Sequence, residues 1–289
     1  MWNIRESFLV GIRKSMKKIT FLAFLWIAFL PLEVLSENGQ WKKADEGLFV
    51  VEFESPQKGK VGDSKITIVK IAPTFYSFKL LCASEREKVG MAAKEWAKKY
   101  GLISAINAGM YQADGMTNVG YMKNFSHVNN PRMNATYNAV LAFNPVDLIV
   151  PEIQIIDRKC QDLDRLRPKY NTLVQNIRMI SCQQENVWSR QDKKWSMVVL
   201  GIDRSGNVLF IFTRVPYSGH DFANVLLGLP IHIYNAMYLE GGPEASLYFS
   251  GGGVEFERVG SYETGFNENE FNLSALPVPN VIGIVKKSK

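Results

Sequence analysis

The sequence predicts a single α+β domain, with a mixed, largely antiparallel sheet at its core and helices flanking that sheet. Three observations predict this class. Most apolar segments are short and have the composition of strands. A polar connection of hairpin type joins the first of them. Two helix patterns with start and stop signals interrupt the strands. The chain has 289 residues, 46% of them hydrophobic, so it can bury a sizeable core.

The N-terminal segment has the pattern of a secretory signal peptide. A lysine pair precedes an apolar run over 19–30, and residues that a signal peptidase tolerates follow as far as Ser36. Met16 is a candidate start, which makes the residues before it an upstream extension. We therefore expect residues 1–36 to be an extension plus signal peptide, and residues 37–289 to form an exported domain, periplasmic or secreted.

An uncleaved membrane anchor is the alternative for this segment, because the apolar stretch is at the short limit for a helix that spans a bilayer. Pro31 and Glu33 interrupt the stretch near its end and favour cleavage. The mature protein is therefore expected to have no stable membrane insertion.

The charge of the chain does not indicate a nucleic-acid partner. The formal net charge is +6, and the first 36 residues contribute half of it, with five basic and two acidic side chains. The remainder carries a small excess that is ordinary for a protein surface. No run of Lys and Arg interleaved with aromatic residues occurs in the body of the chain.

Three cysteines follow the signal segment, so at most one intramolecular disulfide can form. Cys160 and Cys182 flank a polar segment and are the favoured pair, which leaves Cys82 as a free thiol in an apolar strand. Three buried thiols are the alternative. No CxxC or HExxH spacing is present, so no zinc site and no cofactor are predicted. A requirement for a divalent metal is left open.

The N-terminal half is expected to start with antiparallel strands and then form a helix. Strands are predicted around 50–53, 66–69 and 75–81, with a polar connection over 55–64. Ser84 and Glu87 have the spacing of a capping box. Apolar residues at helical spacing follow, as listed here: Val89, Ala92, Ala93, Trp96 and Tyr100. Gly101 supplies the stop, and a short apolar strand over 102–106 comes next.

The C-terminal half repeats this order. A strand over 138–143 precedes a hairpin with arms at 195–202 and 207–213. Ser218 and Asp221 then cap a helix whose apolar face carries Phe222, Val225, Leu226 and Leu229, and which Pro230 closes. The chain enters another strand at Ile233.

Two of these strands end in a polar residue followed by glycine. The first ends at Asn107, and the second ends at Glu240 in the stretch NAMYLEGGPEASLYF. If the two strands lie in one sheet and run the same way, both ends open at the same edge, where sheets of this kind place ligands. The sequence thus predicts a site that contains Asn107 and Glu240.

Four segments in this order resemble the phosphodiester glycosidase family: AINAGMYQADGMTNVGYMKN (105–124), LVQNIRMI (173–180), LGIDRSGNVLFIFTRVPYSGHDFANVL (200–226) and NAMYLEGGPEASLYF (235–249). The resemblance extends over 50–285. It implies hydrolysis of the glycosidic bond of a sugar-1-phosphodiester, with an N-acetylglucosamine-type sugar on a phosphorylated glycan or envelope polymer. One position departs from the family pattern, because Glu240 stands where the family usually has aspartate. The longer side chain keeps the negative charge but places it one methylene farther from the backbone.

Three residues are candidates for the catalytic groups. Glu240 is the candidate carboxylate, because glycoside hydrolysis needs an acid or a nucleophile at the anomeric carbon; a turn-capping acid is the alternative. His220 could supply a proton, and Asp221 is the second choice beside it. For Asp221, the simple role of a partner in the helix cap is the competing interpretation.

Five residues are candidates for binding the substrate. Arg178 lies in an apolar strand, where its charge needs an anion, either the phosphate or a structural partner such as Asp203 or Glu240. Asn107 can bind sugar hydroxyls or phosphate oxygens, and Gly109 lets the backbone approach a ligand. The alternative for this pair is a turn. Gly241 and Gly242 complete the set beside Glu240.

These observations together predict an exported hydrolase that acts on sugar phosphodiesters. Its expected partner is a phosphorylated glycan or a sugar phosphodiester, with no nucleic acid. The alternative is a non-catalytic protein of the same fold that binds a glycan or an envelope polymer.

Overall fold

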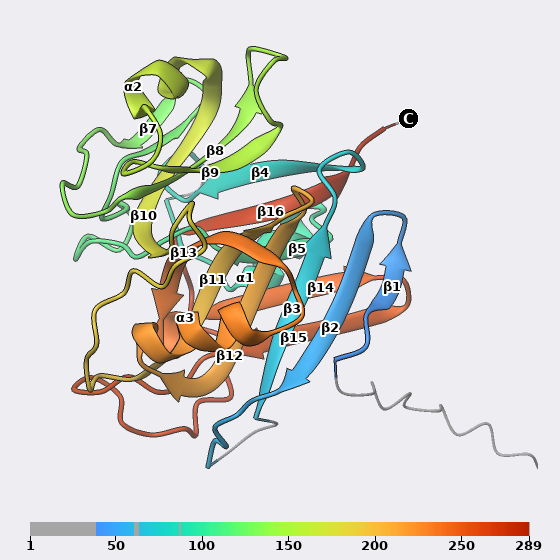
Figure 1. Ribbon diagram of the computed structural model, residues 1–289, viewed down its shortest axis with the longest axis vertical. Coiled ribbons are helices and arrows are strands. Elements are labelled where there is room, and N and C mark those ends of the chain that lie inside the picture. Colours follow the sequence, from blue (N-terminus) through green and yellow to red (C-terminus); the bar gives the residue numbers. More distant parts are fainter. Residues whose placement is uncertain (1–38, 61–63, 87, 289) are drawn as a thin grey trace, which may run out of the picture. The chain divides into compact units, whose positions relative to one another are not determined.

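The computed structural model describes residues 39–60, 64–86 and 88–288 (Figure 1). The predicted signal segment and Glu87 lie outside these residues, so the prediction of a cleaved signal remains a prediction. The described part of the chain contains sixteen strands and three α-helices. None of its helices is long and apolar enough to cross a membrane.

Eleven strands form the larger sheet, and every strand pair in it is antiparallel. Nine of them follow the order β1-β2-β3-β12-β11-β13-β10-β6-β7, while β8 pairs with β10 and β9 pairs with β8. In chain order the strands are β1 Lys42–Asp45, β2 Leu48–Glu54, β3 Lys65–Ile71, β6 Met122–Asn124, β7 His127–Asn130, β8 Ala139–Pro145, β9 Ile153–Asp157, β10 Tyr170–Ile180, β11 Trp195–Asp203, β12 Val208–Tyr217 and β13 Ile233–Gly241.

Five strands form the second sheet, in the order β15-β14-β5-β16-β4, again with antiparallel pairs throughout. In chain order they are β4 Tyr76–Cys82, β5 Ser104–Asn107, β14 Ser246–Gly251, β15 Val254–Val259 and β16 Asn280–Lys286. The helices are α1 Ala93–Tyr100, α2 Leu163–Leu166 and α3 Gly219–Gly228, with 3₁₀ turns η1 Arg167–Lys169 and η2 Gly242–Glu244.

The largest apolar cluster lies between the two sheets. It joins Val69 and Phe210 of the larger sheet to Phe78, Leu247 and other buried side chains of the smaller one. Because side chains alternate across a strand, the neighbouring residues of the larger sheet face the other way. The sequence therefore builds a sandwich of two sheets, each with a second face to cover.

The second face of the larger sheet packs against α3 (Figure 1), through Phe222, Ala223 and Leu226. On the smaller sheet, Trp96 and Ala97 of α1 pack in a separate cluster. The Ser218 side chain caps α3 by accepting a hydrogen bond from the backbone N–H of Asp221 at 3.1 Å, as the sequence predicted. The predicted hairpin between β11 and β12 is also present.

Three sequence predictions about the fold are wrong. The fold is largely β rather than α+β, and none of the named strand pairs is parallel, although the prediction of a largely antiparallel sheet is confirmed. The first helix begins at Ala93, not near Ser84, because the backbone N–H of Ala92 is capped by Glu95 at 2.9 Å. Ser84 instead bonds the ring of His127 at 2.9 Å.

The third error concerns the two polar strand ends. Asn107 ends β5 and Glu240 lies in β13, and these strands belong to different sheets. The ends nevertheless approach each other, since η2 carries the chain directly from β13 in the larger sheet to β14, the neighbour of β5 in the smaller sheet. The corner between the sheets, rather than one common sheet edge, brings them together.

Candidate functional site

The corner at η2 is built around Gly242. Its backbone adopts φ of 67°, a conformation that glycine reaches without strain. A Cβ at this position would meet Glu263 Oε2 at 2.5 Å. The glycine thus allows both the turn and the close approach of a carboxylate to the backbone.

A cavity of about 280 Å³ opens beside this corner. Three of the described residues that line it carry carboxyl groups. The full lining is Met110, Tyr111, Glu240, Gly241, Glu244, Glu263 and Phe266. None of these seven is basic. The cavity therefore combines acidic groups with two aromatic rings, which are the elements of a site for a polar ligand with an apolar face.

Glu240 is the most deeply buried of the three carboxyl groups, with 8% of the residue exposed. It lies opposite Val198 of β11, and its Oε1 accepts a hydrogen bond from the neighbouring Gly241 N–H at 3.0 Å. The pKa of Glu240 is raised to about 8. Burial is the main cause, the hydrogen bond from Gly241 opposes the rise, and the nearby carboxylates of Glu244 and Glu263 add to it. The group can therefore hold a proton at neutral pH.

Glu244 and Glu263 reach the cavity from two separate segments. Their Oε2 atoms lie 3.5 Å and 2.5 Å from the position that a Cβ on Gly242 would take, so the two oxygens are separated by no more than the sum, 6.0 Å. Burial raises the pKa of both carboxyl groups. The charge of Lys193 acts in the opposite direction on Glu263. Lys193 therefore favours the ionised form of Glu263, and no described cation has this effect on Glu244.

Aromatic side chains surround the carboxyl groups. Burial is the main reason why the pKa values of Tyr111, Tyr137 and Tyr238 are raised, and Glu240 contributes to each rise. The Tyr238 ring packs edge-on against Trp188 and Trp195, with ring centroids 5.4 Å and 6.2 Å away. The three hydroxyls are therefore held as neutral groups near the acidic cavity.

Asn107 does not line the cavity but holds the η2 corner in place through hydrogen bonds. Its Nδ2 donates to the backbone oxygen of Glu244 at 3.0 Å, and its Oδ1 accepts from the backbone N–H of Ser246 at 2.8 Å. The residue is 1% exposed. Its amide thus fastens the η2 corner to β5, and in the described structure it is engaged with the protein on both sides.

The predicted glycines all lie in close packing. A Cβ on Gly109 would meet the Oδ1 atoms of Asn118 and Asn176 at 2.6 Å and 2.7 Å. A Cβ on Gly241 would overlap Trp195 and the hydroxyl of Tyr238. Of the three predicted glycines, Gly241 lines the cavity and Gly242 shapes its edge, whereas Gly109 packs against buried amides.

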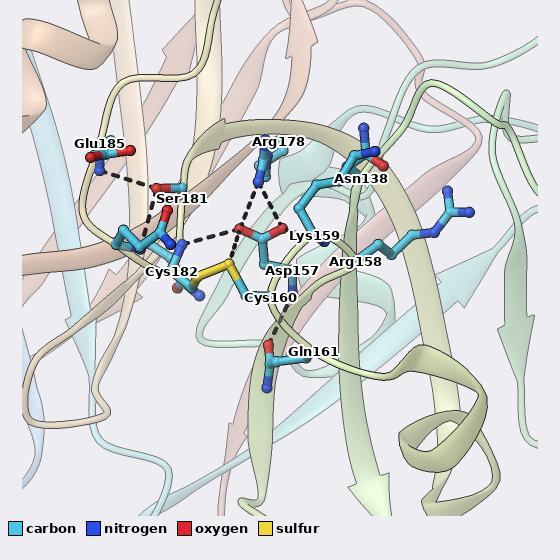
Figure 2. Close-up of polar contacts among 12 residues, drawn as sticks. Asn138, Asp157, Arg158, Lys159, Cys160, Gln161, Arg178, Ser181, Cys182 and Glu185 are labelled. Atoms are coloured by element: carbon cyan, nitrogen blue, oxygen red, sulfur yellow. Dashed lines mark hydrogen bonds and ion pairs between the residues drawn. A yellow bond between two sulfur atoms is a disulfide. The ribbon is translucent and has the colours of Figure 1, made fainter.

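Arg178 is part of a different cluster, which Figure 2 shows. Its Nη1 lies 2.9 Å and 3.0 Å from the two carboxylate oxygens of Asp157, a residue that is 1% exposed. The sequence named Asp203 or Glu240 as structural partners, and that choice of partner is wrong. Asp203 instead accepts hydrogen bonds within its own turn, from Ser205 and Asn207.

The same cluster contains the disulfide. Cys160 and Cys182 are bonded and Cys82 is free and buried, so the predicted pairing is confirmed. Asp157 also accepts a hydrogen bond from the backbone N–H of Cys182 at 3.1 Å (Figure 2). Both sulfurs are used by the disulfide, so this grouping of Asp157 with two cysteines has no thiolate to offer a metal.

His220 and Asp221 lie in the first turn of α3, outside the set of residues that line the cavity. The Nδ1 of His220 is 3.4 Å from an Asp221 carboxylate oxygen. Trp188 packs against Gly219 on one side and Tyr238 on the other. The structure therefore brings Glu240, Gly241 and Gly242 into one site, supported by Asn107, and places His220, Asp221, Gly109 and Arg178 around or away from it.

Glu244 and Glu263 are the site residues that sequence reasoning missed. Glu244 stands only four positions after Glu240, and this pair of acids around a GGP turn was a local signal. Glu263 lies in a segment without a motif and reaches the site through an isolated bridge to Trp195. Only the fold reveals that Glu263 belongs to the site.

A model of the phosphodiester glycosidase family matches residues 100–285 of this chain. The matched range contains β13, η2 and all three glutamates of the cavity. The comparison with curated proteins found no match.

Solved structures with a similar fold include three proteins. A hypothetical protein from Synechocystis is 15% identical with a TM-score of 0.57, over 84% of this chain and 62% of that one. The zebrafish N-acetylglucosamine-1-phosphodiester alpha-N-acetylglucosaminidase catalytic domain, auto-inhibited by its pro-peptide, is 14% identical with a TM-score of 0.55, over 83% and 82%. A putative exported protein from Burkholderia pseudomallei is 9% identical with a TM-score of 0.50, over 76% and 74%.

This chain thus spans less than two thirds of the Synechocystis protein. At such identities the likeness to these structures establishes the fold alone, because one fold can carry many activities.

Proposed function

The chain belongs to the phosphodiester glycosidase family, and on that premise we propose that it is an exported hydrolase that cleaves the glycosidic bond of a sugar-1-phosphodiester. The sugar is of the N-acetylglucosamine type, and the aglycone is a phosphorylated glycan or envelope polymer. The observation that carries the proposal is the convergence of Glu240, Glu244 and Glu263 on one cavity, because glycoside hydrolysis uses a pair of carboxyl groups in different protonation states.

Glu240 is assigned as the general acid. Because burial raises its pKa to about 8, it carries a proton at neutral pH. As the bond between the anomeric carbon and the bridging oxygen breaks, this proton passes to the bridging oxygen, which leaves with the phosphate. Protonation is useful here because the leaving group would otherwise gain negative charge next to two further carboxyl groups.

Glu263 is assigned as the ionised partner. Burial raises the pKa of its carboxyl group, and the charge of Lys193 opposes this rise, an effect that no described cation has on Glu240 or Glu244. It acts on the anomeric carbon directly as a nucleophile, or it removes a proton from the water that attacks this carbon. In either case the water oxygen ends on the sugar, and the products are a free sugar and a phosphomonoester.

The phosphate is assigned to the mouth of the cavity, with its bridging oxygen within reach of the proton of Glu240. Lys193 and Lys194 are exposed and lie immediately before β11. The backbone N–H of Lys194 bonds the hydroxyl of Thr264 at 3.1 Å, directly after Glu263 in the chain. These lysines can therefore offer positive charge to a phosphate at the mouth of the cavity.

Export is the second part of the proposal. The lysine pair and apolar run at the N-terminus support residues 1–36 as an extension plus signal peptide and 37–289 as the exported domain. The Cys160–Cys182 disulfide is consistent with an oxidising compartment. N-terminal sequencing of the protein from its native host should give a start near Glu37. An intact segment in a membrane fraction would favour the anchor instead.

The activity is tested with a panel of sugar-1-phosphodiesters, with and without a chelator. We expect a free sugar and a phosphomonoester in stoichiometric amounts from the parent protein. A Glu46→Gln variant, which changes an exposed carboxyl group outside the cavity, serves as the matched control and should retain full turnover. Tight binding of these compounds without turnover would favour the non-catalytic glycan-binding alternative.

A further inference from the structure

A second cavity continues from the candidate site. It has a volume of about 500 Å³ and adjoins the cavity at η2, since Glu244 and Phe266 line both. The rest of its lining comes mainly from residues 260–279, which connect β15 to β16 and, all being described, contain no helix or named strand. A ligand that extends out of the first cavity past Phe266 can therefore continue into the second.

Two aromatic rings of the second cavity stand exposed. Phe266 is 70% exposed and Phe271 is 75% exposed, and both line this cavity. Single exposed apolar side chains are ordinary, whereas large rings gathered at a hollow of the surface mark a place where a ligand binds. The two rings therefore offer apolar faces to the ligand that fills the cavity.

The backbone on both sides of Phe271 is held in place by an arginine of β12. Nη2 of Arg214 donates hydrogen bonds to the backbone oxygens of Glu270 and Asn272, at 2.5 Å and 2.6 Å. Glu270 is also buried, and its Oε2 accepts a hydrogen bond from the backbone N–H of Lys60 at 2.6 Å. Because the residues before and after it are anchored, Phe271 presents its ring from a fixed backbone, which lowers the entropy lost when a ligand binds.

Three side-chain amides accompany the rings, from Asn267, Asn269 and Asn272. The Nδ2 atoms of these residues donate, in the same order, to the backbone oxygen of Ser261, to Asn267 Oδ1 at 2.7 Å and to the backbone oxygen of Gly260 at 2.8 Å. A side-chain amide has two N–H donors. Each of the three therefore keeps one N–H for which the described residues provide no acceptor, and which a ligand hydroxyl can accept.

The composition of the second cavity indicates an uncharged ligand with many hydroxyls. Among the described residues that line it, none is basic and Glu244 is the one acid. A polymer with a phosphate in every unit would bring anions next to this carboxylate without a compensating cation. A lipid tail would leave the amides without hydrogen-bond partners. Sugar rings satisfy both conditions, because their C–H faces pack on aromatic rings and their hydroxyls bond amides.

We propose that the second cavity binds uncharged sugar residues of the aglycone, and that Phe271 is the ring on which one of them stacks. The inference rests on the proposed function for the bond that is cleaved. It narrows the aglycone to an oligosaccharide whose sugars next to the cleaved bond carry no further phosphate. The N-acetylglucosamine-type sugar then occupies the first cavity, the phosphate lies at its mouth, and the following sugars extend across Phe266 to Phe271.

Binding of free oligosaccharides tests the inference without requiring turnover. Calorimetry of the full chain with maltotriose, cellotriose and chitotriose should detect binding of at least one of them, about 10-fold or more tighter than binding of a glycerol phosphate trimer. Phe271→Ala should weaken this binding about 10-fold, as expected for the loss of a stacked ring, and Phe271→Tyr should retain it.

Leu273→Ala is the matched control, because Leu273 is 79% exposed on the same segment but does not line the cavity. It should bind the trisaccharide as the parent does. All three variants should melt at the parent temperature, since the altered side chains are exposed. Binding of none of the trisaccharides, equal or tighter binding of the glycerol phosphate trimer, or binding that Phe271→Ala leaves unchanged would overturn the inference.

Turnover separates this inference from the proposed function. The substrates are N-acetylglucosamine-1-phosphate esterified either to methanol or to the trisaccharide that binds most tightly. The trisaccharide ester should have a kcat/KM about 10-fold or more above that of the methyl ester, and Phe271→Ala should abolish this ratio chiefly through KM. Equal kcat/KM values in the parent would overturn the inference and leave the proposed function intact. Trisaccharide binding that depends on Phe271, without cleavage of either ester, would contradict the proposed function and support the sugar-binding role of the second cavity.

Discussion

Asn107 Nδ2 donates a hydrogen bond to the backbone oxygen of Glu244 at 3.0 Å, and this bond ties the end of β5 in one sheet to the turn that leaves the other. Because Oδ1 of the same amide accepts from Ser246, a single buried side chain closes the corner on both sides. Two glutamates of the cavity, Glu240 and Glu244, flank this corner in sequence. The geometry of the site thus depends on a residue that does not line the cavity.

Asn107→Ala should therefore lower both stability and activity. It leaves the buried backbone groups of Glu244 and Ser246 without their partner, which costs about 1–3 kcal/mol for each unsatisfied group. Urea denaturation measures the loss of stability. Asn107→Asp keeps the acceptor for Ser246 but places a carboxylate against the Glu244 oxygen, so it should be no more active than Asn107→Ala. Unchanged stability in both variants would show that the corner does not need this amide.

Glu240→Gln should reduce turnover of a sugar-1-phosphodiester by ~100-fold or more, since the amide cannot release a proton. In the parent protein kcat/KM should fall as the pH rises through about 8, because the pKa of Glu240 lies at about 8 and the acid is then lost. The pH profile of initial rates checks this. A stable Glu240→Gln protein with undiminished turnover would remove Glu240 from the mechanism.

The same carboxyl group should make the folded protein less stable at alkaline pH. The ordinary pKa of the side chain is 4.5, whereas in the folded protein it is about 8. Between these values the folded state binds more protons than the unfolded state, so this contribution to stability falls as the pH rises. The melting temperature of the parent should therefore drop relative to that of Glu240→Gln between pH 5 and about pH 9, by roughly 2–4 °C for each kcal/mol. A constant difference in melting temperature would contradict the assigned pKa.

Arg178 is expected to contribute to the stability of the protein but not to substrate binding. Asp157→Asn removes the charge that the arginine faces in a buried site, and breaking such a pair costs about 3–5 kcal/mol. Arg178→Lys keeps the charge but loses the guanidinium geometry, so it should destabilise the protein by less. Both effects are measured by thermal unfolding, and KM for a phosphodiester should stay at the parent value. A KM that rises for phosphodiesters, but not for neutral glycosides, would restore the phosphate-binding role that the sequence suggested.

Because the disulfide uses two of the three described cysteines, only one thiol should react with an alkylating agent. Alkylation of the denatured protein without reductant should label Cys82 and spare Cys160 and Cys182. Reduction should lower the free energy of unfolding by about 2–4 kcal/mol, the usual range for a natural bridge. Peptide mapping provides the first result and urea denaturation the second. Labelling of all three cysteines would rule the bridge out.

Local signals in the sequence predicted several elements correctly. The β11–β12 hairpin follows from two apolar runs around a polar turn, and the cap of α3 follows from the spacing of Ser218 and Asp221. Gly101 ends α1 in the left-handed conformation, as its position indicated. These features depend on residues close together in the chain. The same kind of signal misled at Ser84, because capping propensity there is outweighed by a bond to the distant His127.

The sequence by itself determined that a strand ends in a carboxyl group next to two glycines, and that two cysteines flank a polar segment. It could not determine which groups face Glu240. Glu263 arrives from another segment through a bridge to Trp195, and Arg178 turns to Asp157 rather than to the cavity. Only the tertiary structure decided these neighbours, because the pKa of a carboxyl group and the partner of a buried charge depend on burial and on distances between residues far apart in the chain.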